Sequence, residues 1–171
     1  MVIILKGLIL MLVFISCILI GNLMAKKYIN RVTELKDVKN ALNMFETKIR
    51  FTYAAVPEVF EDIAKQYKTN TVGKIFENVS ELLKEKTAGE AWIEGVDKTN
   101  CSLTKEDKAI LKNLGKMLGK TDLEGQISEL KLVNDFLNTQ IDLAEQERQK
   151  NEKMYRTLGT VMGLGLVIIL I

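Results

Sequence analysis

Residues 121–171 read TDLEGQISELKLVNDFLNTQIDLAEQERQKNEKMYRTLGTVMGLGLVIILI, and their pattern of apolar and polar residues predicts one long helix. Its first half has apolar residues at steps of three and four, the spacing that places side chains on one face of a helix: Leu123, Ile127, Leu130, Val133, Leu137, Ile141 and Ala144. The chain turns almost wholly polar from Glu145 to Arg156, and it is apolar from Leu158 onward. We therefore expect one helix that carries an apolar stripe, then a solvated segment, then a membrane-embedded end.

The start of this helix is also marked in the sequence. Thr121 is a favourable N-cap and Glu124 follows three residues later, which is the spacing of a capping box. Gly119 suits the C-terminal end of a preceding helix. Because so long an amphipathic helix is not stable alone in water, its apolar stripe requires a partner helix.

The composition excludes several classes of function. The chain has 171 residues, a formal net charge of +2 and no histidine, so it lacks the usual general base and the commonest metal ligand. We expect no enzymatic activity, no cofactor and no metal site. No basic patch with interleaved aromatic residues points to nucleic acid. Cys17 lies in an apolar run and Cys101 in a polar turn, so both are predicted to be free thiols in a reducing compartment.

Both ends of the chain are apolar enough to enter a membrane. The run Gly7–Ala25 is flanked by Lys6, Lys26 and Lys27, and we interpret it as a retained anchor because it is longer than the core of a signal peptide. The run from Leu158 reaches roughly 21 Å, less than the ~30 Å hydrocarbon core, but the residues before it can extend the span. The alternative is a tail that enters one leaflet or packs against another protein.

Basic and small residues near these runs predict how the ends meet the bilayer. Basic residues lie on the inner side of each run, so we expect a cytoplasmic middle and both termini across the membrane. The residues expected to contact lipid headgroups are Lys26, Lys27, Arg31, Lys150, Lys153 and Arg156. Small residues spaced by four permit close helix packing in lipid, namely Cys17 with Gly21 and Gly159 with Gly163.

The middle of the chain predicts helices only. Helical spacing continues from Tyr28 to Arg50, and the helix must end before Pro57, because the residue before a proline disfavours the helical conformation. Further helices are expected over 57–67, 72–86, 88–96 and 103–118, the last one capped by Thr104 with Asp107. No segment alternates as a strand does. The predicted fold is an all-α antiparallel helical bundle between two transmembrane helices, with boundaries at 1–25, 26–156 and 157–171.

Two patterns resemble functional motifs but have simpler explanations. Gly119-Lys120-Thr121 ends like a nucleotide-binding loop, yet Gly115 is one residue too close and no apolar strand precedes it. The carboxylates Glu58, Glu61 and Asp62 lie among lysines, which is typical of a solvated helix face. A charged face of this kind also suits docking of a basic partner, and Pro57-Glu58 beside Phe60 is the favoured position.

Several segments, taken in order, resemble one known family. They are Ala41-Leu42 with Glu46 and Ile49, Val56-Pro57-Glu58 with Phe60, Leu114-Gly115 to Leu118-Gly119 with Asp122 and Gln126, Asn151-Glu152-Lys153-Met154, and Leu158 to Leu164. Over essentially the whole chain they resemble the stage III sporulation protein AB family.

This resemblance implies a membrane component of the apparatus that endospore formers build between mother cell and forespore. In that family the cytoplasmic helical domain is similar to platform proteins of type II secretion and type IV pilus systems. The expected location is the mother-cell membrane around the forespore. The implied partners are a secretion-type ATPase and other membrane proteins of the same operon. One departure concerns size, since secretion platforms usually have two such domains and this chain has one.

The resulting expectation is a non-enzymatic membrane platform whose helical domain docks an ATPase. The predicted partner surfaces are the turn with Val56, Pro57, Glu58 and Phe60, and the segment with Gly115, Gly119 and Asp122. Helix capping and core packing are the competing explanation for both. The alternative function is a signalling or regulatory membrane protein that acts as a helical homodimer through the stripe Leu123–Ala144.

Overall fold

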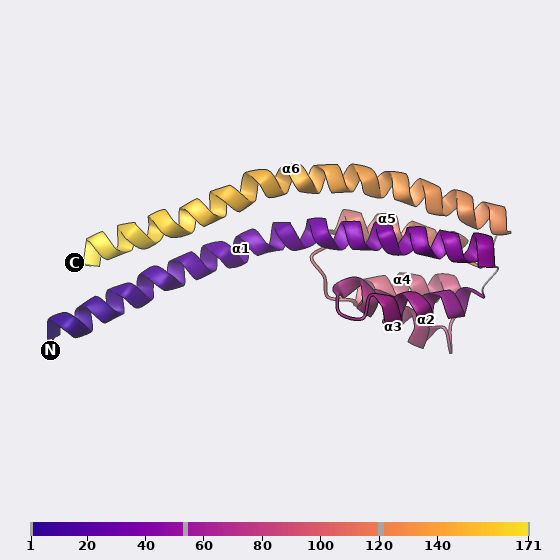
Figure 1. The fold of residues 1–171 in the computed structure, drawn as a ribbon, viewed down its shortest axis with the longest axis horizontal. Coiled ribbons are helices and arrows are strands. Elements are labelled where there is room, and N and C mark those ends of the chain that lie inside the picture. Colours follow the sequence, from indigo (N-terminus) through magenta and orange to yellow (C-terminus); the bar gives the residue numbers. More distant parts are fainter. Residues whose placement is uncertain (1, 53–54, 120–121, 171) are drawn as a thin grey trace. The chain divides into compact units, whose positions relative to one another are not determined.

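The structure is a computed structural model that describes residues 2–52, 55–119 and 122–170. Its described residues form helices and no strands, which confirms the expected all-α class. The elements are α1 (Val2–Thr47), a π-helical turn η1 (Lys48–Thr52), α2 (Val56–Gln66), α3 (Thr71–Leu82), α4 (Ala88–Lys98), α5 (Lys105–Met117) and α6 (Leu123–Leu170). Figure 1 shows the six α-helices in chain order.

The chain divides into two compact units. Unit 1 comprises Met1–Val32 and Leu143–Ile171, and unit 2 comprises Thr33–Asp142. The first and last helices therefore contribute to both units.

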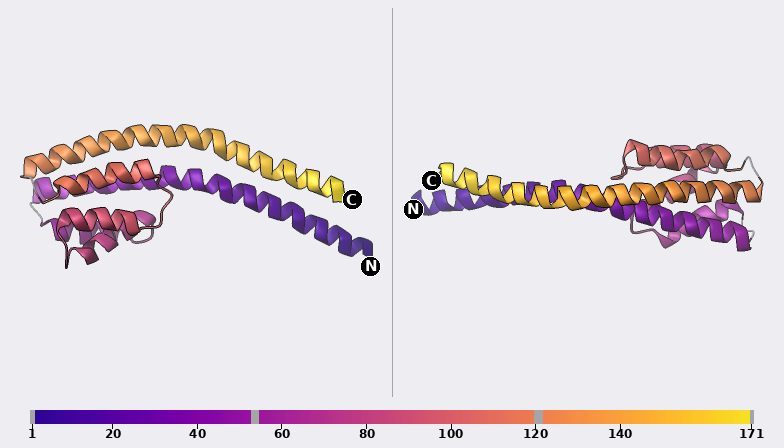
Figure 2. Two further views of the ribbon diagram at one scale, coloured as in Figure 1. Left: turned by 180° about the vertical axis from the view of Figure 1, so that it is seen from behind. Right: turned by 90° about the horizontal axis from the view of Figure 1, so that it is seen from above.

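Within unit 2 the helices form layers. The parts of α1 and α5 in this unit lie between α6 on one side and α2, α3 and α4 on the other (Figures 1 and 2). The α6 stripe faces inward, and its buried members in this unit are Ile127, Leu130, Val133, Leu137 and Ile141, while Ala144 is a buried residue of unit 1. In α1 the residues Leu35, Val38, Leu42 and Phe45 are likewise buried. Asn134 Nδ2 of α6 donates to Asn43 Oδ1 of α1 at 2.9 Å, so α1 is one partner of the stripe.

A cluster of aromatic rings joins α1 to the short helices. The ring of Phe60 lies 5.1 Å from that of Phe45, 5.6 Å from Phe76 and 5.8 Å from Trp92, measured between centroids. All four side chains are buried. Such tilted arrangements are favourable for aromatic pairs and add to the burial of large apolar surfaces. The four residues come from four different helices, so this cluster holds the short helices together.

Helix ends agree with local sequence signals where the structure describes them. The predicted capping box of α5 is confirmed, with Asp107 N–H donating to Thr104 Oγ1 at 3.2 Å. A second capping box, formed by Thr87 and Glu90, starts α4. Thr121 lies outside the described residues, and the first described turn of α6 is capped by Asp122, whose side chain accepts from Gly125 N–H at 3.0 Å.

One predicted helix end is wrong. The expected helix over 72–86 ends at Leu82, and the chain continues as a turn. In this turn the N–H of Lys86 donates to the Leu82 carbonyl at 2.9 Å. The lysine and glutamate residues after Leu82 favour a helix locally, but Thr87 must adopt an extended conformation to cap α4, and this limits the length of α3.

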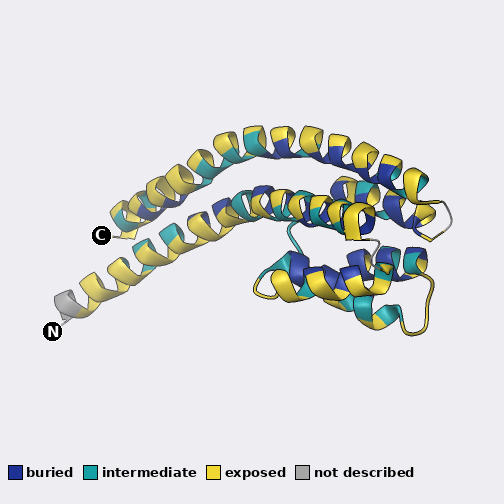
Figure 3. Cartoon of the chain, turned by 45° about the vertical axis from the view of Figure 1, so that its right-hand side comes forward, coloured by how far each residue is buried: buried dark blue, intermediate teal, exposed yellow. Residues whose placement is uncertain are grey.

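In unit 1, α1 and α6 run antiparallel. Gly21 lies beside Gly159, Tyr28 stacks on Tyr155 with centroids 5.9 Å apart, and Arg31 reaches Glu147, so numbers rise along α1 as they fall along α6. Both helices are long and apolar enough to cross a membrane. Their apolar ends are largely exposed, as the yellow ribbon in Figure 3 shows. This exposure is expected for side chains that face lipid rather than a protein core.

Candidate functional site

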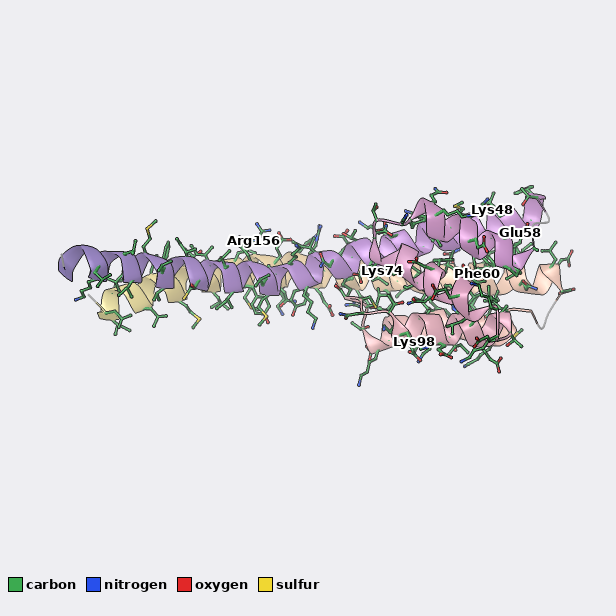
Figure 4. The ribbon with its side chains drawn as sticks, turned by 90° about the horizontal axis from the view of Figure 1, so that it is seen from below. Lys48, Glu58, Phe60, Lys74, Lys98 and Arg156 are labelled. Carbon is green, nitrogen blue, oxygen red and sulfur yellow. The ribbon has the colours of Figure 1, made fainter. Side chains whose placement is uncertain are left out.

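The predicted turn at the start of α2 divides into exposed and buried residues. Pro57 and Glu58 are exposed and Val56 is half-buried. Phe60 is only 1% exposed and lies within the aromatic cluster, inward of Glu58 in Figure 4. Its prediction as a partner-binding residue is therefore corrected: two residues after the exposed Glu58, Phe60 lies on the opposite, core face of α2 and packs between helices.

The carboxylates of this turn are held by neighbouring lysines. Lys48 Nζ donates to Asp62 Oδ2 at 2.8 Å, and this hydrogen bond lowers the pKa of the Asp62 carboxyl. Glu61 lies 3.7 Å from Lys65 one turn later. Glu58 is exposed and has no ion pair among the described residues, so its charge is not offset by a neighbouring lysine.

The second predicted surface, from Gly115 to Asp122, is mainly a packing and capping segment. A Cβ on Gly115 would lie 2.7 Å from Ile93 Cγ1 and 2.9 Å from the Gly89 carbonyl oxygen, so this glycine permits close contact of α5 with α4. Gly119 is exposed and has a φ of +75°, the left-handed conformation that ends helices. Asp122 is exposed and caps α6. Gly115 is therefore corrected from a partner-binding residue to a helix-packing residue.

An apolar groove between α5 and α6 was not predicted from the sequence. Its lining residues are Ile110, Asn113, Lys116 and Met117 of α5, and Glu129, Leu132, Val133 and Phe136 of α6. The side chains of Leu132 and Phe136 are 48% and 49% exposed. The available signal was their spacing of four residues on a face adjacent to the main α6 stripe. The spacing was overlooked because the main stripe already explains one buried face of the helix, and Leu132 and Phe136 lie outside that stripe.

The four small residues predicted to pack in the membrane meet at one helix crossing. A Cβ on Gly21 would lie 2.7 Å from the Tyr155 carbonyl oxygen and 3.1 Å from the Gly159 Cα. A Cβ on Gly163 would lie 2.8 Å from the Phe14 ring and 3.2 Å from the Cys17 Cβ. Backbones this close leave no room for side chains on the glycines.

The six basic residues predicted at the headgroups fall into two groups. Arg31 is 7% exposed and its Nη1 lies 2.6 Å from Glu147 Oε2. Arg156, labelled in Figure 4, pairs with Glu152 at 2.9 Å. The four lysines, Lys26, Lys27, Lys150 and Lys153, are exposed. Arg31 is thus corrected from a headgroup contact to an interhelical ion pair, because its side chain is buried against α6.

Glu34 of α1 is a partly buried carboxylate that the sequence did not single out. Its Oε2 accepts from the Ser102 N–H at 2.6 Å, which ties α1 to the segment between α4 and α5. Burial raises the pKa of Glu34, although the hydrogen bonds from Ser102 and Thr71 oppose this effect. Over the described ranges no cluster of histidine, cysteine or acidic side chains is arranged to hold a metal ion.

These features define a class of protein: an all-α chain with two candidate membrane spans that flank a cluster of short helices. The chain belongs to the stage III sporulation protein AB family, whose model matches residues 6–171. It is 32% identical over 154 residues to stage III sporulation protein AB of Bacillus subtilis (strain 168), covering 88% of this chain and 90% of that protein.

A solved structure of stage III sporulation protein AB (SpoIIIAB) is also similar. It superposes with a TM-score of 0.66 at 26% sequence identity, covering 71% of this chain and 98% of that chain. The family resemblance expected from the sequence is confirmed. Membership of the family supports a role in sporulation, and the two candidate spans support membrane association.

Proposed function

We propose that this chain is a non-enzymatic platform component of a secretion-like channel between mother cell and forespore. In this proposal unit 2 docks an assembly ATPase encoded in the same operon. The family relationship supports the sporulation setting, and the absence of histidine from the whole sequence supports a binding role. The helical construction of unit 2 is consistent with a platform protein.

The proposed location is the mother-cell membrane around the forespore, with unit 2 in the mother-cell cytoplasm. Family membership supports the sporulation setting, and the distribution of basic residues supports the orientation. The lysine pair Lys26 and Lys27 follows the first apolar run, and Lys150 and Lys153 precede the second. Basic residues beside membrane spans favour the cytoplasmic side.

The α5–α6 groove is the observation that carries the docking proposal. The aromatic core of unit 2 is closed, yet Leu132 and Phe136 remain half exposed beside Met117. Isolated apolar residues on a surface are normal, but a groove lined by several apolar side chains suits the apolar face of a partner helix. Lys116 and Met117 of the groove also fall within the segment predicted from the sequence to contact a partner.

The interface predicted for the homodimer alternative is not accessible on the surface of the chain. The stripe that would form it is buried within the chain, with Leu130 and Leu137 fully inaccessible. Leu123 is the member that remains substantially exposed, at 37%. Dimerisation through this stripe would require α6 to separate from its own core.

The docking proposal is tested by measuring affinity between the full chain in nanodiscs and the purified ATPase of the operon. Phe136→Ser is expected to weaken binding at least tenfold, equivalent to about 1.4 kcal/mol. Phe51→Ser is the matched control, because Phe51 is 71% exposed in unit 2 and does not line the groove. Glu58→Arg tests whether the α2 turn contributes.

If Phe136→Ser and Phe51→Ser weaken binding equally, the ATPase does not bind in the α5–α6 groove. Loss of binding in Glu58→Arg alone would place the contact at the α2 turn instead. Absence of any binding, with the helical content of the chain intact, would contradict ATPase docking altogether.

A further inference from the structure

In the polar segments that border the two candidate spans, the arginines form ion pairs and the lysines do not. We call residues 26–31 of α1 and 145–156 of α6 the neck, and both segments belong to unit 1. Every glutamate in the neck pairs with an arginine: Arg31 with Glu147 at 2.6 Å, Arg148 with Glu145 at 2.9 Å, and Arg156 with Glu152 at 2.9 Å. The acidic charge of the neck is therefore matched by its arginines.

The lysines of the neck are left with unmatched charge. Lys26, Lys27, Lys150 and Lys153 are exposed, and within the part of the chain that the structure describes none of them has a carboxylate partner. An ammonium group that has no internal partner is available to an external anion. Its position beside an apolar span makes a membrane lipid the nearest source of such an anion.

Two of these lysines border a hollow on α6. Lys150 and Lys153 line it together with Gln149, Met154, Thr157 and Leu158. Met154 and Leu158 are 40% and 45% exposed, so the hollow has an apolar part next to its two ammonium groups. Phosphate and hydrocarbon are both accommodated by such a surface.

The sequence continues this arrangement along the helix. Lys150, Met154, Leu158 and Met162 are spaced by four residues and therefore share one face of α6. Met162 is 62% exposed. From Met154 to Met162 the helix rises ~12 Å, which is comparable to the ~15 Å depth of one hydrocarbon leaflet. The face changes from cationic to apolar in the direction in which a phospholipid changes from headgroup to acyl chain.

We propose that this hollow binds one anionic glycerophospholipid. The phosphate lies between the ammonium groups of Lys150 and Lys153, and an acyl chain lies along Leu158 and Met162. Gln149 and Thr157 supply further polar atoms for the headgroup. Lys26 and Lys27, which do not line the hollow, contribute only general attraction to the membrane surface. The site is independent of ATPase docking and requires only that the chain associates with a membrane.

The test uses the full chain in neutral detergent and native mass spectrometry to measure the dissociation constant of the first bound lipid. The probes are phosphatidylglycerol, phosphatidylcholine with the same acyl chains, and soluble glycerol 3-phosphate. The unmodified protein is expected to bind phosphatidylglycerol at least tenfold more tightly than phosphatidylcholine. Glycerol 3-phosphate is expected to compete only at far higher concentration, because it lacks the acyl chain.

Paired substitutions separate a defined site from a general charge effect. Lys150→Gln with Lys153→Gln is expected to weaken phosphatidylglycerol binding roughly tenfold or more, since two of the charges that attract the headgroup are lost. Lys26→Gln with Lys27→Gln removes the same amount of charge from the neck but lies outside the hollow. This pair should change the affinity for phosphatidylglycerol by less than about threefold. Lys150→Arg with Lys153→Arg should retain binding.

Three results would overturn the proposal. Equal weakening by the two glutamine pairs would show a diffuse electrostatic collar without a site. Equal affinity for phosphatidylglycerol and phosphatidylcholine would show that the anion is not recognised. Competition by glycerol 3-phosphate at the same concentration as the lipid would identify a site for a soluble phosphate.

Discussion

Trp92 shows how single side chains hold unit 2 together. Its indole N–H donates to the Leu111 carbonyl at 2.6 Å, and its ring lies 5.5 Å from that of Phe76. The side chain is 1% exposed. One residue of α4 thus connects α5 by a hydrogen bond and α3 by ring packing.

We expect Trp92→Phe to lower the free energy of unfolding by roughly 1–3 kcal/mol, because the substitution removes the hydrogen bond and leaves unfilled space. Urea or guanidinium unfolding of the detergent-solubilised chain, followed by circular dichroism, measures this change. Phe51→Leu is the control, since Phe51 is 71% exposed. An equal loss in both variants would contradict a specific structural role for Trp92.

The raised pKa of Glu34 predicts that the free energy of unfolding depends on pH. Because burial raises its pKa, the folded state binds more protons than the unfolded state between the ordinary and the raised pKa. Its contribution to stability is therefore fully present below the ordinary pKa and is lost as the pH rises through the raised value. Glu34→Gln should remove this decline while retaining an oxygen that accepts from the Ser102 N–H.

The measurement is the thermal midpoint Tm at a series of pH values, compared between Glu34→Gln and the unmodified chain. Glu77→Gln is the matched control, because Glu77 is exposed on α3. If Glu34→Gln retains the full decline of Tm with rising pH, the decline has another origin.

At the scale of elements, glycine determines how closely helices approach. Gly21 and Gly159 allow α1 and α6 to contact through backbone atoms, whereas a Cβ on Gly7 or Gly165 would meet no atom within 4 Å. The same residue type therefore has a packing function at one position and no steric function at another. Only the arrangement of neighbouring helices distinguishes the two.

Gly21→Leu is expected to destabilise the packing of α1 on α6 by roughly 1–3 kcal/mol, because the new side chain must displace backbone of the opposite helix. Unfolding of the full chain in mixed micelles of a mild detergent and sodium dodecyl sulfate measures the change. Gly7→Leu should have little effect. A similar stability of both variants would show that close contact at Gly21 does not stabilise the helix pair.

At the scale of the whole molecule, the proposed topology has both candidate spans crossing a membrane and unit 2 on its cytoplasmic side. The basic residues next to the spans favour the cytoplasmic side. This topology also follows from the proposed docking of a cytoplasmic ATPase. The charge distribution and the proposed function therefore both favour a cytoplasmic position of unit 2.

Topology is tested with a single cysteine in unit 2. Ser128 is exposed on α6, so Ser128→Cys in a Cys17→Ser, Cys101→Ser background provides an accessible thiol. With the variant produced in vegetative cells, where it inserts into the plasma membrane, a membrane-impermeant maleimide is expected to label inside-out vesicles and to leave intact protoplasts unlabelled. A membrane-permeant maleimide should label both. Labelling of intact protoplasts by the impermeant reagent would reverse the predicted orientation.

The all-α class, the approximate helix positions and the two apolar ends can all be predicted from the sequence alone. These properties depend on local signals: helical spacing in 121–171, the proline at 57, and the capping pair Thr104 and Asp107. The family was also recognisable, because several short segments along the chain resemble it. Local propensity and apolar periodicity are sufficient for conclusions of this kind.

The neighbours of each residue could be identified only once the helices were seen packed together. The tertiary structure showed that Phe60 belongs to the core, that Gly115 packs against α4, and that Leu132 and Phe136 are half exposed. It also separated the paired arginines of the neck from its lysines. Periodicity places residues on a helix face, but burial and ion pairing depend on residues distant in sequence. The physical reason is that these contacts form only when helices far apart along the chain come together.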